Sequence, residues 1–133
     1  MAPHDHSLSL SRWAGIGALS ACIGVGLGAF GAHSLKSILT SDMLAIFETG
    51  VRYQMYHAGG MIAAGLAGLI RRESPRRFIQ AAWSFGLGTI VFSGSLYVLA
   101  LSGVRWPGAI TPVGGILFVT GWLLFASALL HRS

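Results

Sequence analysis

The stretch FIQAAWSFGLGTIVFSGSLYVLALSGV, residues 78–104, contains no Asp, Glu, Lys or Arg. A helix needs about 20 mostly apolar residues to cross a bilayer, so this stretch is long enough to span a membrane. Residues 13–35, 53–70 and 106–131 also lack these four residue types. Together the stretches leave little of the 133 residues for a soluble domain. The sequence therefore predicts an all-α, polytopic membrane protein.

We expect four spanning helices that pack as a compact bundle in a single transmembrane domain covering residues 1–133. Their expected bounds are about 13–34, 53–70, 78–101 and 113–131. The glycines and prolines of the segment Ser102 to Pro112 predict a loop between the last two helices.

The segment before the second span, residues 41–52, follows a helical period without being apolar throughout. Met43 and Phe47 fall on one side of this helix, and Glu48 and Arg52 fall on the other. An amphipathic helix of this kind is suited to the plane of the membrane interface. We expect an interfacial helix here, which either stands alone or runs into the second span with a bend at Gly50.

The composition agrees with a membrane setting. Hydrophobic residues make up 53% of the chain and charged residues only 10%, whereas soluble domains average about 25% charged residues. The net charge of +5 comes largely from a loop, residues 71–77, that holds four arginines. We interpret this loop as a topology signal and expect no nucleic-acid partner. The single cysteine, Cys22, excludes a disulfide framework and a thiolate metal site.

Basic residues in short loops predict the orientation, because they favour the cytoplasmic side. If both termini are inside, the inner side has six arginines: Arg12, Arg71, Arg72, Arg76, Arg77 and Arg132. The outer side then has three basic residues: Lys36, Arg52 and Arg105. We therefore expect a multi-pass protein of the plasma (inner) membrane with both termini in the cytoplasm. No basic residue precedes Arg12, which argues against a cleaved signal peptide.

Small residues recur at helical spacing within the expected spans. The predicted helix-packing positions are Gly17, Ala21, Gly24, Gly28, Gly60, Ala64, Gly68, Gly88 and Gly121. Small side chains let membrane helices approach closely, so that dispersion and weak interhelical contacts hold a bundle together. The pattern predicts a bundle with the glycine face of the first helix near its centre, and lipid as the surrounding medium.

Polar side chains gather near the end of the first span and the start of the second. The candidate functional cluster is His33, Lys36, Glu48, Arg52, Tyr53, Gln54 and His57. Glu48 and Arg52 stand four residues apart, which favours an interfacial ion pair. Tyr53 and His57 have the same spacing on the small-residue side, so we expect His57 to point into the bundle. Ionisable groups in a membrane are candidates for function, and buried histidines also serve as hydrogen-bonded structural groups.

The sequence contains no catalytic carboxylate pair, phosphate loop or nucleophile triad, so we expect a protein that is not an enzyme and needs no metal or other cofactor. Our leading hypothesis is association between helices, as a homo-oligomer or as an accessory subunit of a larger membrane complex. The alternative is transport of a small solute or of protons by the polar cluster around His57. A remote alternative is a haem held by His33 and His57 as axial ligands.

Several runs of sequence resemble a known family. They are GAFGAHSLK at 28–36, FETGVRYQMYHA at 47–58, FSGSLY at 92–97, TPVGG at 111–115 and GW at 121–122. Their order and spacing are similar to those of the small bacterial membrane proteins known as domain of unknown function four-two-three, to which mammalian transmembrane protein two-fifty-six is related. The resemblance covers roughly residues 13–131. It implies several spans and no assigned reaction.

The resemblance also directs attention to residues at the family's motif positions: Phe30, Gly31, His33, Tyr53, Gln54 and His57. One departure follows the second histidine, where Gly59 and Gly60 replace the bulkier aliphatic residues that the family would lead us to expect.

Overall fold

The structure, a computed structural model, describes residues 3–131, and the side chains from residue 5 onward. Its long helices are α1 (Pro3–His33), α2 (Ser41–Ile70), α3 (Pro75–Ser102) and α4 (Thr111–Leu130). Two short 3-10 helices, η1 (Leu35–Ser37) and η2 (Trp106–Ala109), lie in the connections. The described chain is therefore an all-α, four-helix bundle, as the charge-free stretches predict.

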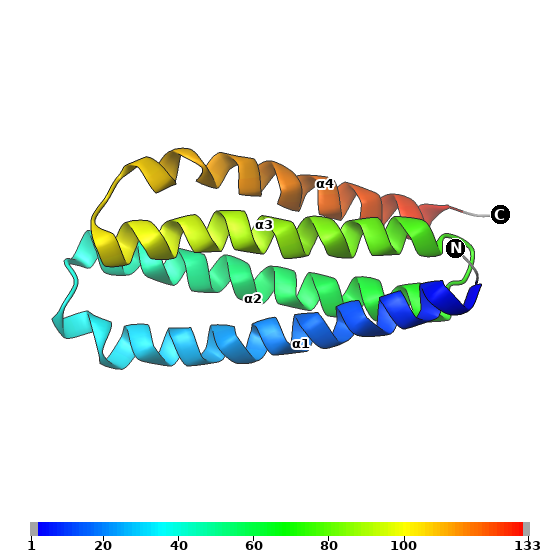
Figure 1. Cartoon of the computed structure of the whole chain (residues 1–133), viewed down its shortest axis with the longest axis horizontal. Helices are drawn as coiled ribbons and strands as arrows, with labels where there is room; N and C mark the ends of the chain where they lie inside the picture. The colour runs from blue at the N-terminus through cyan, green and yellow to red at the C-terminus, as the bar shows by residue number, and fades with distance from the viewer. Residues whose placement is uncertain (1–2, 132–133) are drawn as a thin grey trace.

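The four long helices run antiparallel to their neighbours, and α1 begins at the end of the bundle where α4 finishes (Figure 1). Each helix packs on the next one in the chain, and α1 also contacts α3. Ten residues of α2 and eight of α3 are buried, against four of α4. The centre of the bundle is therefore the pair α2 and α3. The glycine face of α1 packs against α2, at the edge of this pair.

Three described helical segments are long and apolar enough to cross a membrane: Asp5–Ser37, Pro75–Ser102 and Trp106–Leu130. The helix α2 has comparable length, with 30 residues. It is less apolar because it contains Tyr53, Gln54 and His57. Gln54 and His57 are buried between helices rather than exposed to lipid, so a lower hydropathy is compatible with its central position.

Residues 41–52 form the first turns of α2 and not a separate helix, so the predicted interfacial helix is not shown. The side chain of Thr40 caps the start of α2 by accepting a hydrogen bond from Met43 N at 3.3 Å. Helix α2 continues through Gly50 without a break. Tyr97 of α3 packs where a side chain at Gly50 would lie, and Ser93 Oγ donates to Gly50 O at 2.6 Å. These contacts hold Gly50, where the sequence suggests a bend, within a continuous α2.

The helix α1 also begins earlier than expected, at Pro3 instead of near residue 13. Its added turns are held by tertiary packing, because Leu10 is buried in a cluster with Phe78 of α3 and Ala128 of α4. The other helices differ from the predicted spans at their ends: α3 begins at Pro75 and is ended by Gly103, whose φ of 71° is a left-handed cap.

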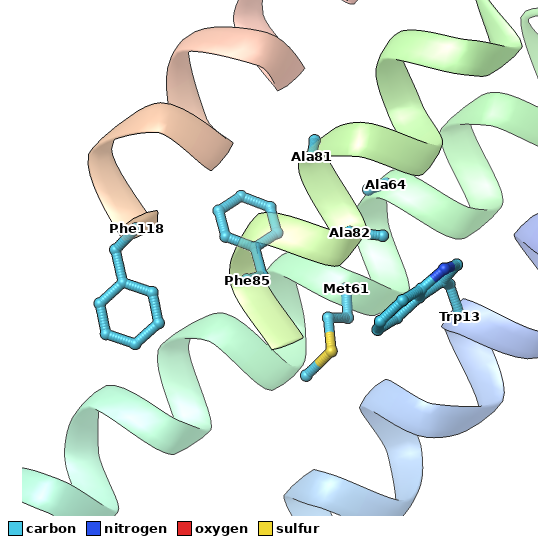
Figure 2. Close-up of a cluster of buried hydrophobic side chains, with 7 residues drawn as sticks. All are labelled: Trp13, Met61, Ala64, Ala81, Ala82, Phe85 and Phe118. Atoms are coloured by element: carbon cyan, nitrogen blue, oxygen red, sulfur yellow. The ribbon is translucent and has the colours of Figure 1, made fainter. Parts of the chain in front are cut away.

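Side chains from all four long helices meet in the largest buried cluster (Figure 2). Its members are Trp13, Met61, Ala64, Ala81, Ala82, Phe85 and Phe118. Phe85 lies against two glycines. A Cβ at Gly60 would lie 3.0 Å from its ring, and a Cβ at Gly121 would lie 2.6 Å from it. Glycine at both positions therefore makes the space that this ring fills.

Most of the other predicted packing positions also lie at helix contacts. On α1, Cβ atoms at Gly17 and Gly24 would meet Ala58 O at 2.8 Å and Met55 Sδ at 2.6 Å, both on α2. The remaining positions are partly buried Ala21, Gly28 near Val51, buried Ala64, Gly68 against Leu10 and Phe78, and Gly88 against Phe118. Gly114, which the sequence places at seven-residue spacing with Gly121, approaches the backbone of α3 at Phe92, and Gly65, which the sequence did not single out, approaches the backbone of α1.

Candidate functional site

His57 occupies the middle of α2, and both of its ring nitrogens have partners. Trp122 Nε1 of α4 donates a hydrogen bond to His57 Nε2 at 3.2 Å. An indole N–H can only donate, so Nε2 must be the unprotonated nitrogen. His57 Nδ1 then holds the proton and donates to Tyr53 O at 2.6 Å. This pair of hydrogen bonds defines a neutral histidine in one tautomer.

The faces of the His57 ring are also covered. The ring stacks on Phe118 with a centroid distance of 3.4 Å and an interplanar angle of 5°, and Phe85 lies at 5.7 Å. Only 4% of His57 is exposed. His57 therefore joins α2 to α4 and points toward α4. His57 is buried in the bundle, as we expected, and its partner helix is α4 rather than α1.

Gln54 connects three helices through one amide group. Its Nε2 donates to Ser20 O of α1 at 2.9 Å, and its Oε1 accepts from Tyr97 OH of α3 at 2.7 Å. The side chain is buried, with 6% exposed. An amide is suited to this place because it offers a donor and an acceptor at once. Gln54 is thus the polar link of α1, α2 and α3.

Serine and threonine hydroxyl groups link α3 to α4 and add a further hydrogen bond between α2 and α3. Ser95 Oγ of α3 lies 2.7 Å from Thr111 Oγ1 of α4, and Ser93 of α3 donates to the backbone of α2 as described above. Interhelical hydrogen bonds in membrane proteins stabilise by about 0.6 kcal/mol on average. The buried polar groups therefore form a distributed set of weak helix contacts.

A groove of about 780 Å³ lies between α2 and α4, beside His57. It is lined by Tyr53, Tyr56, His57, Phe92, Pro112, Gly115, Ile116, Phe118, Val119, Thr120 and Trp122. Tyr53 forms part of its wall by stacking on Phe92, with the ring centroids 4.5 Å apart. Tyr56 is 57% exposed. The groove is mostly aromatic and aliphatic, and its lining includes the buried His57.

The other four members of the predicted polar cluster are not brought to this place. His33, Lys36, Glu48 and Arg52 are all exposed. In the described part of the chain, Glu48 and Arg52 form no ion pair with each other, so the predicted pair is wrong.

The geometry does not fit a shared haem or a metal site. Gly17 of α1 lies beside Ala58 of α2, which places His33 about 24 Å further along the bundle than His57. Two axial ligands must lie on either side of one iron, so His33 and His57 cannot serve together. Among the described residues, no three His, Cys, Asp or Glu side chains cluster as metal ligands would.

Sequence reasoning missed Ser20, Tyr97 and Trp122 as partners of the buried polar residues. Tyr97 and Trp122 fall within two of the runs, FSGSLY and GW, that carry the family resemblance, and that was the only signal for them. Each is far from its partner in the chain and lies on another helix. No periodicity within one helix could have paired them.

A bundle of helices with several candidate spans, whose buried polar groups bind one another, defines a small polytopic membrane protein. The chain belongs to the family described as "Protein of unknown function (DUF423)", whose model matches residues 27–115.

Curated relatives support this assignment. The chain is 46% identical to the UPF0382 membrane protein SH2409 of Staphylococcus haemolyticus over 109 residues, which cover 82% of this chain and 87% of the relative. It is 42% identical to the UPF0382 inner membrane protein YgdD of Escherichia coli over 107 residues, 80% of each chain. YwdK of Bacillus subtilis, also named a UPF0382 membrane protein, is 40% identical over 114 residues, 85% of this chain and 91% of YwdK. No solved structure matches.

Proposed function

We propose that this protein is a non-enzymatic helix bundle that works by associating with other membrane helices. Its first partner is a second copy of the chain, and the assembly serves as an accessory unit of a larger membrane complex. The observation that carries the proposal is an exposed stripe of small residues along α1. The stripe consists of Gly15, Ala18, Cys22, Gly26 and Ala29.

The stripe is separate from the glycines that build the bundle. Gly17 and Gly24 face α2, where a Cβ would clash, whereas a Cβ at Gly15 or Gly26 would meet nothing within 4 Å. At 100° per residue the two pairs lie on opposite sides of α1. A small-residue seam on a lipid-facing side lets a second helix approach closely. The internal contacts of the chain leave this seam free for that role.

The hydrogen bonds of the buried polar groups favour a structural role for these groups. His57 and Gln54 use their donors and acceptors on neighbouring helices, as described above. A proton acceptor or a nucleophile needs an atom that is free to react, and these side chains offer none in this conformation. His57 and Gln54 therefore hold helices together, which leaves the outer faces to act on partners.

The unique cysteine gives a direct test, because Cys22 lies within the stripe and is exposed. Oxidation of native membranes should produce a disulfide-linked dimer in the wild type. Moving the cysteine by one residue, in the double variant Cys22→Ser, Ile23→Cys, turns it by about 100° at the same depth and should reduce the dimer strongly. Gly26→Leu should do the same by blocking close approach. Equal cross-linking from both positions, or a monomer in native membranes and in mild detergent, would refute the proposal.

For the membrane arrangement, the proposal places all four long helices across the plasma (inner) membrane, with both termini in the cytoplasm. The helix α2 is packed between α1 and α3 along its length, and the E. coli relative is named an inner membrane protein. The exposed Glu48 and Arg52 in the first turns of α2 then lie at the outer interface. A fluorescent protein fused to the C-terminus should fold and fluoresce, whereas alkaline phosphatase fused there should be inactive. The reverse pattern would contradict this orientation.

The groove beside His57 favours a second candidate function, the transport of a small solute or of protons. Its volume of about 780 Å³ is large enough for a small molecule. Flux into proteoliposomes containing the wild type or His57→Ala tests this candidate. Transport predicts a flux of solute or protons through the wild type that His57→Ala abolishes. The association model predicts no flux through either protein.

A further inference from the structure

The arginine-rich loop takes part in a small cavity at the end of the bundle where α1 begins and α4 ends. The cavity has a volume of about 280 Å³. It is lined by His6, Glu73, Ser74, Pro75, Arg76, Arg77 and His131. These residues come from α1, from the start of α3 and from the residue after α4. The lining contains two arginines and two histidines but a single carboxylate, so the cavity favours an anion.

Several donors at this cavity have no acceptor from the described chain. The side chain of Ser74, which precedes α3, makes no capping hydrogen bond. Its carbonyl accepts from Arg77 N and Phe78 N, and Pro75 has no N–H, so the N–H of Arg76 is the one left open in the first turn of this long helix. His6 Nδ1 is buried and has no hydrogen-bond partner. A helix N-terminus with unsatisfied N–H groups attracts negative charge. Together with the histidine, it points to an anionic oxygen ligand.

The arginines of the loop divide into two roles. Arg71 donates through Nη1 to Leu129 O, and Arg77 donates through Nη1 to Ser127 O at 3.5 Å. Both carbonyls lie in the last turn of α4, where the helix dipole is negative, and these two arginines offset that charge. Arg76 is exposed and makes no hydrogen bond among the described residues. Arg76 is therefore the cation that is free to bind a ligand.

We infer that this cavity binds the phosphate group of an anionic phospholipid. The surroundings favour a lipid over free phosphate, because apolar side chains next to the cavity residues are exposed where acyl chains would lie. Leu8 is 52% exposed and Leu130 is 80% exposed. Lipid with anionic headgroups is enriched at the cytoplasmic surface, where the arginine-rich loop is expected. The loop then both orients the protein and holds a specific lipid.

The full-length protein in neutral detergent can be titrated with phosphatidylglycerol or with phosphatidylcholine of the same acyl chains, and bound lipid can be counted by native mass spectrometry. We expect retention of phosphatidylglycerol over phosphatidylcholine. Arg76→Gln should weaken phosphatidylglycerol binding about fivefold, the loss expected when one direct hydrogen bond to the headgroup is removed. The matched control is Arg72→Gln, which removes the same charge from the same loop outside the cavity. It should change binding by less than about twofold, because exposed charges are screened.

Three results would overturn the inference. Equal retention of the two lipids would exclude recognition of the anionic headgroup. An equal loss with Arg72→Gln would show diffuse attraction instead of a defined cavity. Displacement of the lipid by millimolar inorganic phosphate, with equal binding of phosphate alone, would assign the cavity to a free anion. As a control for folding, both variants should unfold at the same temperature as the wild type, so that a change in lipid binding is not caused by a loss of structure.

Discussion

Replacing Gly65 by Ala should push α1 away from α2, whereas the same replacement at Gly59 should not. A Cβ at Gly65 would lie 2.6 Å from Leu10 O and 2.9 Å from both the N and the Cβ of Ala14, while ordinary contact begins at 3.4 Å. Most of these atoms belong to the backbone of α1, so no side-chain rotation can relieve the clash. A Cβ at Gly59 would meet nothing within 4 Å.

Apart from this contact, the two substitutions have the same expected effect on helix stability. Both positions lie inside α2, and replacing Gly by Ala in a helix interior gains about 0.8–1.0 kcal/mol. Forcing an extra methyl group into a packed contact costs about 1–3 kcal/mol. We therefore expect Gly59→Ala to stabilise the protein by about 1 kcal/mol. Gly65→Ala should be less stable than Gly59→Ala by about 1–3 kcal/mol.

The free energies can be measured by reversible unfolding in mixed micelles with increasing SDS, followed by circular dichroism. Gly59→Ala is the matched control, because it has the same change in residue and helix propensity without the contact. If Gly65→Ala is as stable as Gly59→Ala, α1 and α2 are not in close contact at this level, and the packing described above is wrong.

Three further predictions concern the buried polar groups and the loop. Tyr97→Phe should destabilise the protein by about 0.6 kcal/mol, and a double-mutant cycle should show no such loss when Gln54 is already replaced by Leu. The ¹⁵N NMR spectrum of His57 should show a proton on Nδ1 alone, and Trp122→Phe should shift it toward a mixture of tautomers. Arg71→Gln should speed amide hydrogen exchange in the last turn of α4, because the arginine donates to a carbonyl there.

The four long helices could be predicted from the sequence because membrane crossing depends on length and apolarity, which each segment contains in itself. The stretches 78–104 and 106–131 therefore gave α3 and α4 nearly complete. Helix continuity at Gly50 and the early start of α1 depend on contacts with other helices. Leu10 is held by Phe78 and Ala128, and nothing near residue 10 in the sequence shows these partners.

The candidate site could be predicted only where it depends on the spacing of residues within one helix. Helical spacing brings Tyr53 close to His57 within α2, and the structure stacks these two rings with centroids 6.0 Å apart. The direction in which they point depends on which helix packs there. The donor to His57 comes from Trp122, 65 residues further along the chain. Residues near the helix ends, such as His33 and Lys36, were grouped with this site because the predicted topology places them at the same end of the bundle.

The glycines of α1 show why a sequence pattern alone cannot separate folding from assembly. Gly15, Gly17, Gly24 and Gly26 lie in one apolar helix, and each is typical of a close helix contact. The structure divides them, since Gly17 and Gly24 contact α2 whereas Gly15 and Gly26 have open space. A larger side chain at the first pair must disturb the bundle, and one at the second pair leaves it intact. A loss of dimer in Gly26→Leu without a loss of stability would therefore assign the outer face of α1 to association.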